Sequence, residues 1–205
     1  MINPDMRAIV FSFLIADLTI TLFMILIAVQ NFRRFRGVNA WVTAFLLHNI
    51  GIILIELRGS IPDWVSIVLS NTMIVSGLLA GLKGLCSFTG VKMKHVHNYA
   101  VIILFTGFQA WFTYGDPDLG LRGVNLACAM VIFSAQYLWL IFVRVTGNAR
   151  KVAAGVGIVY IGYAVVNIIR IIHYFTGPPI SNDYFQAGTF DKAIFISYQV
   201  LFIFL

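Results

Sequence analysis

The sequence predicts an all-α fold: a polytopic membrane bundle of seven transmembrane helices, with the N-terminus outside and the C-terminus in the cytoplasm. Composition is the first observation, because the 205 residues are 60% hydrophobic and 11% charged, with a mean hydropathy of +0.91. A soluble domain carries more surface charge than this. The second is continuity: the apolar segments run for roughly 20 residues, the length that crosses a bilayer, and lack the alternation of a β-barrel strand.

The expected spans cover residues 8–30, 38–57, 64–86, 97–114, 122–145, 152–175 and 192 onward. The first is an anchor rather than a cleavable signal peptide, because its apolar stretch is too long and a basic cluster follows it. All 5 prolines lie in terminal or loop sequence, which leaves the helices unbroken. The seventh span reaches Leu205 with only about two thirds of the residues that a crossing requires. We therefore expect residues 1–205 to be a transmembrane domain truncated within its seventh helix, with a cytoplasmic domain beyond residue 205.

Charge sets the expected orientation. The connections between spans one and two, three and four, and five and six contain no Asp or Glu, which predicts the cytoplasmic side. The basic residues on that side are Arg33, Arg34, Arg36, Lys83, Lys92, Lys94, Arg144, Arg150 and Lys151. This asymmetry accounts for the net charge of +6, so the expected partner is membrane lipid and not nucleic acid.

Small residues mark the third span. Gly77, Gly81 and Gly84 are spaced four and three residues apart, on one side of a helix. Small side chains allow helices to approach closely inside a membrane. The pattern predicts a packing role, with the third span central in the bundle or at a dimer interface.

Polar residues inside the spans indicate a candidate site, because each costs free energy unless it is paired or faces water. In span six, Tyr163, Asn167, Arg170 and Tyr174 are spaced four, three and four residues apart and so share one helical face, which His173 flanks. Other spans carry polar residues at matching depth. They are Glu56, Arg58, Asn71, Arg122 and Asn125, with Asp17 near the middle of span one.

Two interpretations of these residues stay open. In one, Arg58, Arg122 and Arg170 converge and bind an anionic or lipid-like ligand through bidentate contacts to a carboxylate or phosphate. In the other, Arg58 and Arg122 are interfacial anchors, and Arg170 is neutralised by Glu56 or Asp17 to fix helix packing.

The chain offers no pattern for catalysis, a metal or a cofactor. It lacks CxxC, HExxH and phosphate-binding glycine motifs. His95 and His97 lie in a loop without acidic or thiol companions, and Lys192 opens span seven rather than occupying its middle, where a Schiff-base lysine would be needed. We therefore expect a chain that is not itself an enzyme and binds no metal or cofactor.

Three segments between residues 31 and 90 carry a resemblance: "NFRRFRG", "ELRGSIPDWVSIVLSN" and "GLLAGLKGLCSFTG". The chain resembles the N-terminal seven-helix sensor regions of bacterial diguanylate cyclases with GGDEF output, and of some membrane histidine kinases. The resemblance implies a sensory input domain in the bacterial inner membrane, acting as a homodimer. Its seventh helix would transmit a stimulus to a cytoplasmic cyclase or kinase.

Two other functions are open. One is a small-solute transporter, in which the polar stripe lines a substrate path, although spans one to three and five to seven show no convincing internal repeat. The other is a structural membrane subunit, in which the stripe pairs only with itself.

Overall fold

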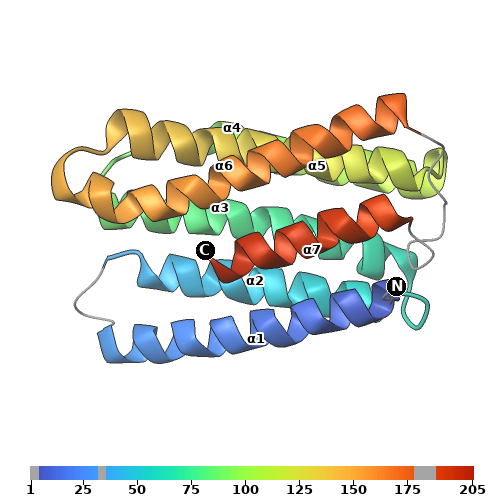
Figure 1. Ribbon diagram of the computed structural model, residues 1–205, viewed down its shortest axis with the longest axis horizontal. Helices are drawn as coiled ribbons and strands as arrows, with labels where there is room; N and C mark the ends of the chain where they lie inside the picture. The colour runs from blue at the N-terminus through green and yellow to red at the C-terminus, as the bar shows by residue number, and fades with distance from the viewer. Residues whose placement is uncertain (1–4, 32–35, 178–187) are drawn as a thin grey trace.

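The computed structural model describes residues 5–31, 36–177 and 188–205, and within these ranges it consists of helices joined by short connections, without a β-strand (Figure 1). The predicted all-α class is therefore confirmed. The α-helices are α1 (Met6–Asn31), α2 (Val38–Glu56), α3 (Ser70–Thr89), α4 (Val96–Ala110), α5 (Leu119–Trp139), α6 (Gly147–Thr176) and α7 (Thr189–Ile203). Three π-helical segments extend them: η1 (Trp64–Leu69) before α3, η2 (Trp111–Gly115) after α4 and η3 (Leu140–Arg144) after α5.

Five helical stretches are long and apolar enough to cross a membrane. They are Met6–Gln30, Val38–Glu56, Trp64–Thr89, Leu119–Arg144 and Gly147–Thr176. Their outward faces carry large apolar side chains such as Phe23 and Ile158, which are 61% and 68% exposed. Such surfaces suit lipid and not water. The chain thus has the features of a multi-pass membrane protein.

The remaining two helices, α4 and α7, are not both long enough and apolar enough to be included. Helix α7 has 15 residues, and α4 also has 15 and carries polar residues such as Asn98 and Gln109. The predicted spans at 97–114 and from 192 onward coincide with these two helices to within a few residues. The count of seven crossings stays a prediction.

The helices run along one long axis, so each connection lies at one of two ends (Figure 1). The connections after α3 and η3 lie at the end that carries Lys92, Lys94 and Arg150, while Asp63 and Asp118 lie at the other. At the basic end, burial and the charges of Lys83 and His97 lower the pKa of His95, so this ring is neutral near pH 7. Arg33, Arg34 and Asp183 lie outside the described residues.

Close approach of α2 and α3 forms the centre of the bundle. Gly77 and Gly84 of α3 face α2, where a Cβ at Gly77 would lie 3.0 Å from the Ala44 carbonyl oxygen and one at Gly84 would lie 2.5 Å from the Trp41 ring. Gly81 faces Tyr137 of α5 instead. The predicted packing role of the three glycines is confirmed, and it places α3 between α2 and α5.

Gly51 provides a test of this packing. A Cβ at Gly51 would lie 2.8 Å from the Ser70 backbone oxygen, so a larger side chain has to push α2 and α3 apart. We expect Gly51→Val to lower the free energy of unfolding by about 1–3 kcal/mol, the usual cost of overpacking. The matched control is Gly155→Ala in α6, where no atom lies within 4 Å. This control is expected to leave stability unchanged or raise it by up to about 1 kcal/mol. Reversible unfolding in mixed micelles measures both, and equal stabilities would contradict the close approach.

Candidate ligand-binding cavity

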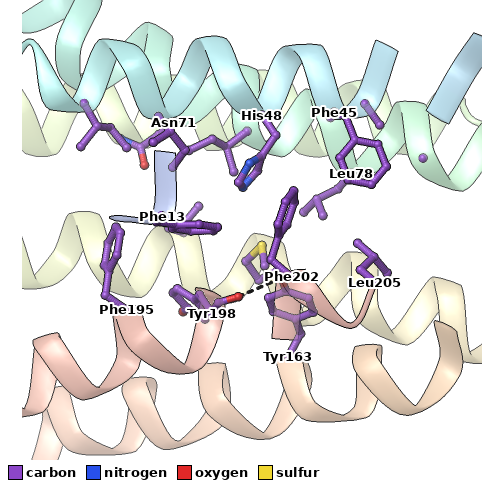
Figure 2. A pocket seen from close by; sticks show the side chains of 18 of the residues that line it. Phe13, Phe45, His48, Asn71, Leu78, Tyr163, Phe195, Tyr198, Phe202 and Leu205 are labelled. Carbon is purple, nitrogen blue, oxygen red and sulfur yellow. Dashed lines mark hydrogen bonds between the residues drawn. The ribbon is translucent and has the colours of Figure 1, made fainter. Parts of the chain in front are cut away.

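A cavity of about 400 Å³ lies inside the bundle, and residues from all seven α-helices line it. Its α3 wall runs from Asn71 to Leu85, a distance of about 21 Å at 1.5 Å per residue. Figure 2 shows its middle, where Phe13, His48, Tyr163, Tyr198 and Phe202 surround one space. The volume falls within the range of small-molecule sites, about 300–1,000 Å³, and the lining is mostly apolar.

Arginine side chains define one end of this cavity. Arg58 precedes η1, Arg122 lies in the first turn of α5, and Arg170 lies near the end of α6, so all three come from the same end of the bundle. No Asp or Glu is among the lining residues within the described ranges. We call this region the arginine end. The three arginines, which both interpretations of the sequence concern, thus line one cavity.

Each of these arginines has a neighbour that partly compensates its charge or anchors it. The Arg170 guanidinium lies 3.9 Å from the Asp191 carboxylate in the first turn of α7. Arg58 donates to the Ser66 backbone oxygen at 3.2 Å. Asp63 and Asp118 lie close enough to Arg122 to attract it electrostatically. In addition, the Nε atom of Arg122 is buried without a hydrogen-bond partner among the described residues.

Arg170 therefore has a different partner from the one predicted. Glu56 or Asp17 was expected to neutralise Arg170, but the ion pair of Arg170 is with Asp191. The reason is adjacency: α6 and α7 are consecutive and packed together, so the start of α7 lies beside the end of α6. Gly123 of α5 leaves room for this arrangement, since a Cβ there would lie 2.8 Å from the Arg170 Nη2 atom.

The rest of the predicted stripe on α6 packs against its neighbours. The Asn167 side-chain oxygen accepts from the Tyr198 hydroxyl at 2.6 Å, and the Asn167 amide donates to the Tyr163 backbone oxygen. Tyr174 donates to Asp118 at 3.1 Å, outside the cavity lining. Of the stripe, Tyr163 and Arg170 line the cavity.

Some of the other predicted site residues line the cavity and others do not. Asn71 lines the cavity, with its amide bonded to the Ile67 backbone oxygen. Asn125 does not line it but donates to the side chain of Gln109, which does. His173 stacks on Phe190 with ring centroids 3.6 Å apart, and Glu56 ends α2 with one buried oxygen unbonded among the described residues. Neither His173 nor Glu56 lines the cavity.

A buried pair in the middle of the bundle was not predicted. The fully buried Asp17 of α1 lies 2.8 Å from the Nδ1 atom of His48 of α2. His48 lines the cavity, and its ring stacks on Phe202 of α7 at 4.6 Å between centroids. The sequence contained a sign of this pair, because Asp17 and His48 are ionisable residues in the middle of consecutive spans. Such residues require a partner in a membrane.

The geometry of the cavity suits the binding of a small molecule. The arginine end can hold an anion, and the apolar remainder can hold a hydrocarbon portion of the same molecule. No family model, curated protein or solved structure matches this chain.

Proposed function

We propose that this chain is the transmembrane sensory input domain of a bacterial signalling receptor. Seven helices cross the inner membrane, the arginine end faces outward and the basic end faces the cytoplasm. Excess Lys and Arg at the basic end supports this orientation. Helix α7 continues into a cytoplasmic output module, a diguanylate cyclase or a histidine kinase. The receptor is a homodimer, as the sequence resemblance implies.

The observation that carries this proposal is the position of α7. Phe195, Tyr198 and Phe202 of α7 form one wall of the cavity, and Asp191 at its start lies against Arg170. A ligand in the cavity therefore touches the helix that would lead to the output. Such a ligand shifts the receptor only if it binds one position of α7 better than another.

The test uses the natural coding sequence and the protein that it encodes. We expect a GGDEF or kinase domain in frame after α7, and an output activity that changes when the cavity is occupied. A stop codon shortly after α7 would contradict the proposal.

A transporter is the second candidate, because residues of both α1–α3 and α5–α7 line the cavity, and alternating-access carriers bind substrate between two such groups of helices. Uptake of a radiolabelled anion into vesicles containing the protein would favour it. Binding without uptake would favour the sensor.

A further inference from the structure

We infer that the cavity binds a long-chain carboxylate, a single-chain amphiphile whose headgroup takes the place of Asp191 at Arg170. This inference rests on the proposed function and names the ligand class of the same site. It is carried by the shape of the cavity, by the distribution of charge along it and by the weak Arg170–Asp191 contact.

The shape favours one acyl chain. The α3 wall of the cavity extends for about 21 Å, whereas a membrane acyl chain spans about half of the roughly 30 Å hydrocarbon core. Beyond the arginine end, the wall is mostly aliphatic and aromatic as far as Trp41 and Leu85, with His48 in its middle. A molecule with its charged group at the arginines can thus keep an extended tail within the bundle.

The charge favours a monoanion. Three arginines line the arginine end, but Asp191, Asp63 and Asp118 are close to two of them. A monoanion that displaces Asp191 replaces one negative charge by one and so keeps the balance of three arginines and three carboxylates, whereas the two charges of a phosphate monoester would exceed it. A carboxylate is also what Arg binds in a planar, bidentate manner.

The contact between Arg170 and Asp191 explains how binding reaches α7. At 3.9 Å the pair is at the outer limit of an ion pair, and both side chains are about one-sixth exposed, at 17% and 15%. A ligand carboxylate that contacts the guanidinium directly replaces Asp191. The start of α7 then loses this ion pair with α6 and keeps only the stacking of Phe190 on His173 there, while the tail lies against Tyr198 and Phe202 farther along α7.

Quenching of Trp41 fluorescence tests this arrangement, because Trp41 lines the end of the cavity opposite the arginines. The other tryptophans are lipid-facing, so Trp64, Trp111 and Trp139 are replaced by Phe. The full-length protein is placed in phosphatidylcholine nanodiscs and titrated with a fatty acid brominated at its chain end. We expect saturable quenching by the acid and only weak, non-saturating quenching by its methyl ester.

Variants separate the headgroup contact from a folding defect. Arg170→Gln is expected to weaken binding by about thirtyfold or more, the usual effect of removing one partner of a buried charge pair. Asp191→Asn is expected to strengthen binding up to about fivefold, since it removes the competing carboxylate. A misfolded protein would not bind more tightly. The matched control is Lys151→Gln, an exposed lysine at the opposite end of α6, which is expected to change nothing.

Three outcomes overturn the inference. They are equal quenching by the acid and the methyl ester, unchanged binding in Arg170→Gln, and tighter binding of a lysophosphatidate than of the fatty acid. Because this assay records binding alone, it separates the inference from the proposed function. Binding without any effect on output would defeat the sensor proposal and leave the site intact.

Discussion

Replacing Asp17 by Ala is expected to lower the free energy of unfolding by about 3 kcal/mol. Asp17 is fully buried and lies 2.8 Å from His48 on the neighbouring helix. Removing one partner of a buried ion pair costs about 3–5 kcal/mol, because the other charge stays buried without compensation. A neutral hydrogen bond between membrane helices contributes only about 0.6 kcal/mol on average. The measured cost therefore also reports whether the pair is charged.

Reversible unfolding of the protein in mixed micelles measures this cost. Asp17→Asn keeps an oxygen that accepts from His48, so we expect it to retain part of the stability. Asp116→Ala, which removes an exposed carboxylate from the connection between α4 and α5, is the matched control and should lie within about 0.5 kcal/mol of wild type. If Asp17→Ala also lay within that margin, Asp17 and His48 would not be paired in the folded protein.

Replacing Phe202 by Ala is expected to uncouple the cavity from the output. The Phe202 ring stacks on His48 and makes edge contacts with Phe13 and Phe45, at 5.5 Å between ring centroids in both cases. These contacts join α7 to α1 and α2. A shift of α7 can therefore be transmitted to α1 and α2 through the Phe202 ring. Allosteric coupling is typically worth 5–150-fold in affinity or response. We expect the output response to fall at least about fivefold.

Saturating ligand distinguishes uncoupling from a loss of binding. Because the ligand tail would lie against Phe202, we expect Phe202→Ala to weaken binding as well, so the output responses of the variants are compared at saturating ligand. Phe204→Ala, directly after the end of α7, is the matched control, because the Phe204 side chain is 74% exposed. A Phe202→Ala protein that responds as strongly as Phe204→Ala would show that the signal does not pass through this ring.

Sequence patterns predicted the helices well because lipid imposes a simple rule on them. A run of apolar residues has to be as long as the membrane is thick, so the predicted limits of the sixth span, residues 152–175, fall within α6, Gly147–Thr176. The position of a residue along the bundle was predictable for the same reason. Arg58 follows α2, Arg122 lies in the first turn of α5 and Arg170 lies near the end of α6, so all three line the cavity from the same end of the bundle.

The pairing of polar groups was harder to predict, because depth does not tell which helices are neighbours. Asp17 was considered a partner for Arg170, whereas it lies against His48 of α2. Asn167 was a candidate ligand contact, but Tyr198 of α7 occupies its side-chain oxygen. Both outcomes depend on the packing order of α1, α2, α6 and α7, which the periodicity of a single helix does not encode.

A distance between α7 and α6 tests most directly whether an anion at Arg170 controls the position of α7. Spin labels are attached at Phe204→Cys and Val152→Cys, two exposed positions, after Cys86 and Cys128 have been replaced by Ala. We predict that a saturating long-chain fatty acid shifts the distance between the labels by about 1–2 Å, the size of typical helix shifts. Asp191→Asn is predicted to produce the same shift without ligand. An unchanged distance in both cases would contradict the claim.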